Sequence, residues 1–154
     1  TTLLARVFQA QGFESIACGN IRKKKIGELD RLTPQAKVIL EVSSFQLLHT
    51  FSLHPRIGIL LNLGLNHLDW HPTMEEYVAA KLRLFENQTP EDKALIRRKD
   101  QQQFFPDFHF QGQVVYWGET PERNANEAVL EEVARLKGLD PRTVQEVLSK
   151  FEGI

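Results

Sequence analysis

Two mostly apolar runs, the first of them rich in β-branched residues, constrain the fold of this chain more than any other feature. They cover residues 36–42 and 57–63, and segments with helical spacing precede and follow them. A strand without polar alternation is typical of a parallel sheet that helices cover on both faces. The sequence therefore predicts an α/β fold with a mostly parallel sheet flanked by helices.

The rest of the chain alternates helices and strands in the same way. Leu3, Leu4, Val7 and Phe8 share one helix face from the first residues, and Gly12 supplies a stop signal. Further strands are expected at 13–18, 93–96 and 113–117, and further helices at 43–53, 73–87, 124–136 and 141–151. The segment 101–110 has no assignment. Because the helical spacing begins at the first residues, we expect the chain to be part of a longer domain.

Length and composition indicate one globular domain or a piece of a larger protein. The 154 residues are 42% hydrophobic, and 19 Lys and Arg residues against 20 Asp and Glu residues give a net charge of −1. No overall positive field therefore favours nucleic acid or an anionic membrane as a partner. Cys18 is the only cysteine, which excludes an internal disulfide, and no apolar run reaches the ~18 residues of a membrane span. We expect a cytoplasmic protein.

Glu41 lies at the carboxyl end of the first apolar run, and Ser43 and Ser44 follow that run directly. Ligands of parallel sheets bind at the carboxyl ends of the strands, where these side chains are expected. A carboxylate in that place can hold Mg²⁺, which prefers oxygen ligands and keeps waters or phosphates in its shell. In the alternative interpretation Glu41 reaches solvent, and Ser43 caps the helix that follows.

The loop after the second apolar run is dense in potential ligands, with His67, Asp69 and His71 close together. If this loop were helical, the two histidines would share a face that Asp69 does not, so a three-ligand zinc site is awkward here. The alternative is that both histidines form hydrogen bonds within the loop.

Lys81 lies inside the helix expected from Thr73, beside Ala79 and Ala80. A lysine among small residues can approach a ligand closely, although lysines on helices are usually solvated. The basic run 22–25 has two similar interpretations, a phosphate contact or a solvated turn. The sequence contains no Gly-Lys pair and thus no G-x-x-x-x-G-K-[ST] phosphate loop.

Four motifs, taken in order, resemble the central domain of the Mur ligases. They are Gly19-Asn20-Ile21, Glu41-Val42-Ser43-Ser44-Phe45-Gln46-Leu47, Leu61-Asn62-Leu63 with His67-Leu68-Asp69, and Tyr77-Val78-Ala79-Ala80-Lys81. The second motif looks most like the family members that add D-glutamate. The resemblance implies a partial, P-loop-like ATP-binding domain over residues 1–154. Its first strand and phosphate loop, an N-terminal UDP-binding domain and a C-terminal amino-acid-binding domain would be missing.

The resemblance also implies a reaction in peptidoglycan synthesis. The substrates would be UDP-N-acetylmuramoyl-L-alanine and D-glutamate, with ATP and Mg²⁺ as cofactors. The matching site positions are the metal ligands Glu41, His67 and a carbamylated Lys81, the nucleotide-sugar contacts Asn20 and Ser43, and the adenine contact Asn126. His67 and Lys81 are the expected catalytic residues.

Three positions depart from the family pattern. Arg22 replaces a glycine, Asn66 an aspartate and Arg123 an asparagine. Together with the missing phosphate loop, they predict weak or absent binding of ATP and Mg²⁺ and no activity of the chain alone. The two functions considered are a fragment of a ligase and a non-catalytic binding module with a decayed fold. The Ser-Ser-Phe-Gln run disfavours the folate-polyglutamating relative.

Overall fold

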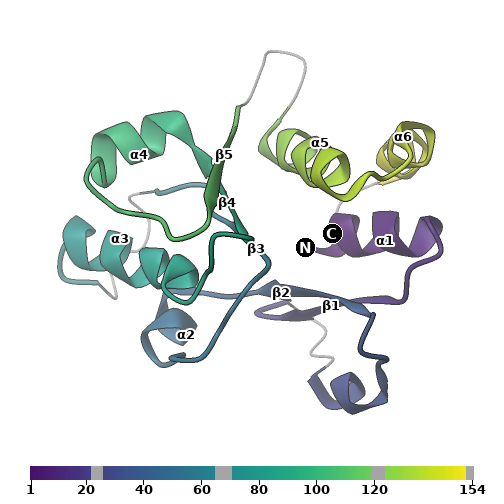
Figure 1. The fold of residues 1–154 in the computed structure, drawn as a ribbon, viewed down its shortest axis with the longest axis horizontal. Coiled ribbons are helices and arrows are strands. Elements are labelled where there is room, and N and C mark those ends of the chain that lie inside the picture. Colours follow the sequence, from purple (N-terminus) through teal and green to yellow (C-terminus); the bar gives the residue numbers. More distant parts are fainter. Residues whose placement is uncertain (22–25, 65–70, 119–123, 152–154) are drawn as a thin grey trace. The chain divides into compact units, whose positions relative to one another are not determined.

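A computed structural model describes residues 1–21, 26–64, 71–118 and 124–151 (Figure 1). Its elements are α1 (Thr2–Ala10), β1 (Ser15–Gly19), the 3-10 helix η1 (Ile26–Arg31), β2 (Lys37–Glu41), α2 (Ser44–Leu48), β3 (Ile57–Ile59), α3 (Met74–Leu82), the 3-10 helix η3 (Arg83–Phe85), β4 (Lys93–Arg97), α4 (Arg98–Phe104), β5 (Gln113–Trp117), α5 (Ala125–Lys137) and α6 (Pro141–Ser149). The chain forms two compact units, Thr1–Val42 with Leu130–Ile154 and Ser43–Val129.

The first unit contains a parallel pair of strands, β1 and β2, covered by α1. The opposite side of α1 packs against α6 (Figure 1). The apolar residues of α1 recur at helical spacing, and those that face inward are buried. The hydroxyl of Ser15 donates to the carbonyl of Ala5 at 2.7 Å, and Gln11 exchanges hydrogen bonds with the backbone of Asp140 at 3.0 and 3.1 Å. These contacts join α1 to the strand on one side and to α6 on the other.

The prediction that residues 36–42 form a strand buried on both faces is wrong in its second half. The strand forms, but Val38 is 49% exposed and Leu40 is 44% exposed. Side chains alternate between the two faces of a strand, and α1 covers only the face that carries Ile39. Among the described residues β2 pairs only with β1, so β2 is an edge strand.

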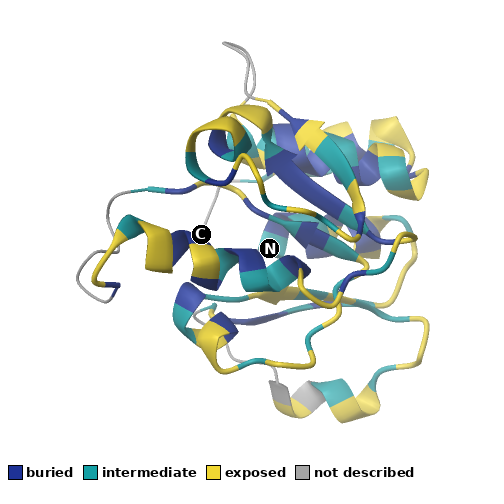
Figure 2. Cartoon of the chain, turned by 60° about the vertical axis from the view of Figure 1, so that its left-hand side comes forward, coloured by how far each residue is buried: buried dark blue, intermediate teal, exposed yellow. Residues whose placement is uncertain are grey.

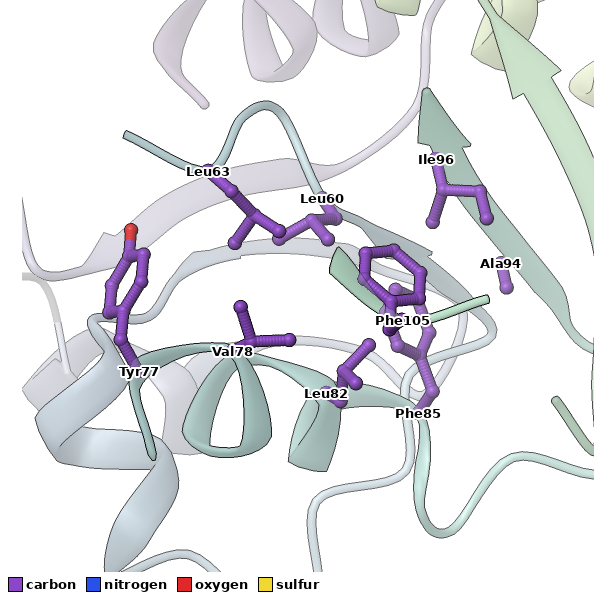
Figure 3. Packing of buried hydrophobic residues seen from close by; sticks show 9 residues of the cluster. All are labelled: Leu60, Leu63, Tyr77, Val78, Leu82, Phe85, Ala94, Ile96 and Phe105. Atoms are coloured by element: carbon purple, nitrogen blue, oxygen red, sulfur yellow. The ribbon is translucent and has the colours of Figure 1, made fainter. Parts of the chain in front are cut away.

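The second unit contains the parallel sheet β3-β4-β5. Its core brings α3 and η3 against the face of β4 that carries Ala94 and Ile96 (Figure 3). The helices bury one side and expose the other (Figure 2). Phe85 is 1% exposed, and Ala94 and Ile96 are fully buried. Burial of a side chain the size of Phe or Ile contributes about 2 kcal/mol of hydrophobic stabilisation.

The structure confirms the parallel α/β class and corrects several boundaries. The expected strand 57–63 ends at Ile59, and Leu60 adds one more bond from its amide to the carbonyl of Leu95, at 2.9 Å. The expected helix 73–87 is α-helical only to Leu82 and continues as η3. Part of the unassigned segment 101–110 belongs to α4. None of the described helices is both long and apolar enough to cross a membrane.

Candidate functional site

Asn20 and Glu41 are neighbours at the carboxyl ends of β1 and β2. Gly19 and Glu41 are register partners, and the amide of Asn20 donates to the carbonyl of Glu41 at 2.7 Å. Gly19 makes this approach possible. It has a φ of +95°, and a Cβ at this position would lie 2.2 Å from the carbonyl oxygen of Glu41. The Glu41 carboxylate is exposed and accepts a hydrogen bond from the Thr1 hydroxyl at 3.0 Å.

Ser43 begins α2 and is held by a capping box. Its hydroxyl accepts from the amide of Gln46 at 3.2 Å, and its own amide donates to Oε1 of Gln46 at 2.9 Å. Both donors would otherwise be unsatisfied at the helix start. The motif thus folds as one of the sequence interpretations expected, with Ser43 rather than Ser44 as the cap.

Ser44 joins the first predicted ligand cluster to the second. Its hydroxyl lies 2.9 Å from Nε2 of His71, and both residues are buried. The ring of His71 also stacks on Phe45, with 5.3 Å between ring centroids. The interpretation of His71 as a hydrogen-bonding residue agrees with this geometry. His67, Asn66 and Asp69 lie outside the described residues, as do Arg22 and Arg123.

Lys81 lies in the last turn of α3 and is only partly exposed. Its Nζ is 5.8 Å from the ring centroid of Tyr77, a cation–π contact. Burial raises the pKa of the Tyr77 hydroxyl, and a hydrogen bond with the backbone of Gly64 opposes part of that rise. A second link joins η3 to α2, because Nε of Arg83 donates to the carbonyl of Leu47 at 2.9 Å.

Asn126 lies in the first turn of α5, with its side chain exposed. Oδ1 of Asn124 accepts from the amides of Asn126 and Glu127 at 2.9 and 3.2 Å, so Asn124 caps this helix. Two amides of the helix start are therefore satisfied without the Asn126 side chain, and Asn126 is exposed.

The structure places the predicted site residues in two groups. Asn20 and Glu41 belong to the first unit, and Ser43, Lys81 and Asn126 belong to the second. Within the described ranges, no three His, Cys, Asp or Glu side chains form a group that could hold a metal ion. The ligand set expected from the sequence includes His67, which lies outside these ranges, and a modified Lys81. Sequence reasoning missed the Ser44–His71 pair, whose members lie 27 positions apart.

Comparison with known proteins gives a consistent family. The family model of the Mur ligase middle domain matches residues 24–138. The chain is 40% identical over 100 residues to a UDP-N-acetylmuramoylalanine--D-glutamate ligase of Pelotomaculum thermopropionicum, which covers 65% of this chain and 22% of that protein. A ligase of the same name from Geobacter sp. strain M21 is 42% identical over 100 residues, with the same coverage.

The fold resembles a solved Mur structure over almost its whole length. The crystal structure of MurF ligase from Thermotoga maritima in complex with ADP aligns with a TM-score of 0.63 and 13% identity. The alignment covers 99% of this chain and 46% of that one. This likeness shows the fold alone. The chain spans about a fifth of the length of the curated relatives described above.

Proposed function

We propose, from the premise that this chain belongs to the Mur ligase family through its middle domain, that it is part of a ligase that adds D-glutamate to UDP-N-acetylmuramoyl-L-alanine. The observation that carries the proposal is the identity of about 40% to such ligases over two-thirds of the chain. The proposed process is peptidoglycan synthesis in the cytoplasm, and the proposed partners are small molecules rather than nucleic acid or membrane.

In the proposed reaction, the γ-phosphoryl group of ATP is transferred to the terminal carboxylate of the substrate and ADP leaves. The amine of D-glutamate then attacks the acyl phosphate, an amide bond forms, and phosphate leaves with loss of a proton from nitrogen. Asn20 and Ser43 would orient the nucleotide-sugar substrate, and Asn126 would contact adenine. Such chemistry depends mainly on positioning and on neutralising the phosphate charges.

The donors that we propose for the metal suit Mg²⁺ in kind. Glu41 offers carboxylate oxygens at a strand end, and carbamylation of Lys81 would replace a cation with a second oxygen donor. We assign Glu41, His67 and Lys81 to the metal and give Lys81 and His67 the catalytic roles. Bound Mg²⁺ would supply positive charge next to the transferred phosphoryl group.

The residues needed to bind the triphosphate of ATP, unlike the metal ligands, are not all in this sequence. The sequence has no Gly-Lys pair, so the lysine and the backbone cradle of a phosphate loop are missing from these 154 residues. We therefore propose that residues 1–154 form a partial ATP-binding domain that is inactive alone. The departures Arg22, Asn66 and Arg123 favour a second candidate, a binding module of the same fold without catalysis.

Release of ADP tests the proposal that the 154-residue chain is inactive alone. With ATP, Mg²⁺, UDP-N-acetylmuramoyl-L-alanine and D-glutamate, we expect no turnover. Turnover that Glu41→Ala abolishes would contradict that proposal and show a complete active site.

Metal binding tests the ligase assignment separately. Amide NMR spectra recorded with traces of Mn²⁺ should show broadening at Asn20, Ser43 and Lys81, with a dissociation constant of about a millimolar because few charged ligands are present. Glu41→Gln should remove this broadening, whereas Glu146→Gln, on the exposed side of α6, should leave it unchanged. Broadening that does not depend on Glu41 would favour the non-catalytic module.

A further inference from the structure

His71 and its neighbours form an unbroken series of contacts that leads from Ser43 to Lys81. Ser43 caps α2, and the next residue, Ser44, lies 2.9 Å from Nε2 of His71. The His71 ring is 5.4 Å from the ring of Tyr77, and Nζ of Lys81 lies 5.8 Å from that same Tyr77 ring. All these residues belong to the second unit.

The Ser44–His71 pair is too deeply buried to act on a substrate. A spacing of 2.9 Å suits a nucleophile and its base. However, Ser44 is 5% exposed and His71 is 3% exposed, and Phe45 and Tyr77 lie against the imidazole. A hydrogen bond in such surroundings fixes the position of its two partners, because breaking it would leave buried polar atoms unsatisfied.

We propose that His71 is a positioning residue, which holds α2 through the Ser44 hydroxyl and packs against Tyr77, so that Ser43 and Lys81 keep one fixed arrangement. This inference rests on the proposed function, in which Ser43 contacts substrate and Lys81 holds the metal. His71 itself touches neither of them in this assignment.

Tyr77 is well placed to transmit the position of His71 to α3. It is 2% exposed and forms one end of the hydrophobic cluster of the second unit, with its hydroxyl directed away from α3 (Figure 3). The cluster fixes the ring on one side and His71 contacts it on another. A shift of the imidazole would therefore be opposed by packed neighbours.

Three variants separate the hydrogen bond from the ring contacts. Ser44→Ala removes only the hydroxyl, and His71→Phe keeps a ring but loses Nε2. His71→Gln keeps an N–H group at a similar reach. Val144→Ala is the stability control, because Val144 is 3% exposed and lies in α6 of the first unit.

The experiment uses the Mn²⁺ broadening of the Ser43 and Lys81 amides in the 154-residue chain. We expect Ser44→Ala and His71→Phe to weaken apparent Mn²⁺ affinity about tenfold, as loss of a supporting hydrogen bond does at metal sites. They should also change the ratio of broadening at Ser43 to that at Lys81. His71→Gln should restore both quantities, and Val144→Ala should alter neither.

The outcomes separate this inference from the proposed function. If folded Ser44→Ala and His71→Phe chains keep the normal affinity and ratio while Glu41→Gln abolishes broadening, the positioning role is wrong and the proposed function stands. Impairment of His71→Gln equal to that of His71→Phe would also overturn it. If the unsubstituted chain shows no Glu41-dependent broadening, the metal assignment within the proposed function fails and this inference fails with it.

Discussion

Nε2 of His54 lies 2.5 Å from Oδ2 of the Asp92 carboxylate, whose residue is only 1% exposed. The same oxygen accepts from the amide of Thr89 at 2.7 Å and from its hydroxyl at 3.0 Å, and Arg56 reaches Oδ1 at 3.4 Å. His54 and Arg56 precede β3, and Asp92 precedes β4. One buried carboxylate therefore ties together the entries of two neighbouring strands, at the edge of the sheet opposite to the strands' carboxyl ends.

Asp92 should make the free energy of unfolding of the chain fall at acidic pH. Burial by itself raises the pKa of this carboxyl, but the hydrogen bonds from Thr89 and His54 outweigh burial and hold the pKa well below its usual value. The stability that the Asp92 carboxylate contributes is therefore present above the unfolded pKa of about 3.9. It is lost as the pH falls further, through the lower folded pKa. Urea denaturation between pH 7 and 2 should show this loss.

Replacement of the same carboxylate tests the assignment of that acid sensitivity. Asp92→Ala should lower the free energy of unfolding at pH 7 by about 3 kcal/mol, because buried partners lose their acceptor. The loss of unfolding free energy between pH 7 and 2 should be smaller in this variant than in the unsubstituted chain. Asp107→Asn, at an exposed position, serves as the charge control. Equal acid sensitivity in Asp92→Ala and the unsubstituted chain would show that other groups cause it.

Gly19 and Gly12 form a matched pair for the strand end that carries Asn20 and Glu41. Both have a positive φ, +95° and +82°, but only at Gly19 does a Cβ meet the chain, at 2.2 Å from the Glu41 carbonyl oxygen. Gly12→Ala should cost about 1 kcal/mol for the backbone conformation alone. Gly19→Ala should cost about 3 kcal/mol because backbone must also move. Equal losses in chemical denaturation would show that the close approach is not rigid.

Gly58 in β3 leaves room for Phe85. A Cβ on Gly58 would lie 2.9 Å from the Phe85 ring. Gly58→Ala should therefore destabilise the second unit by about 2 kcal/mol through overpacking. Adding Phe85→Leu should make the double variant about 1 kcal/mol more stable than the sum of the single effects, since the smaller side chain relieves the clash. Additive effects in a double-mutant cycle would contradict this contact.

Val38 and Leu40 should promote association of the chain. Both are exposed on β2, an edge strand among the described residues, and exposed apolar edges favour pairing with another chain. Val38→Lys should lower the apparent mass in light scattering at high concentration. Gln145→Lys changes the net charge equally from an exposed site on α6 and should have no such effect. A monomeric unsubstituted chain would show that this face does not associate.

The sequence by itself determined the α/β class, the parallel strands and the starts of most helices. These depend on local patterns: the apolar run before Glu41, the cap at Ser43 and the proline that starts α6. Parallel topology also places the carboxyl ends of neighbouring strands at one edge, and the pairing of β1 with β2 in the structure then makes Asn20 and Glu41 neighbours. The family likeness was visible in the four motifs that begin at Gly19, Glu41, Leu61 and Tyr77.

Only the tertiary structure decided which side chains meet and which faces are covered. The apolar sequence of β2 is compatible with burial of one face or of both faces. Only the helix that packs on the strand makes Ile39 less exposed than Val38. The pairs Ser44–His71 and His54–Asp92 lie 27 and 38 positions apart. No local pattern encodes such a contact, because a hydrogen bond between distant residues depends on the path of the whole chain between them.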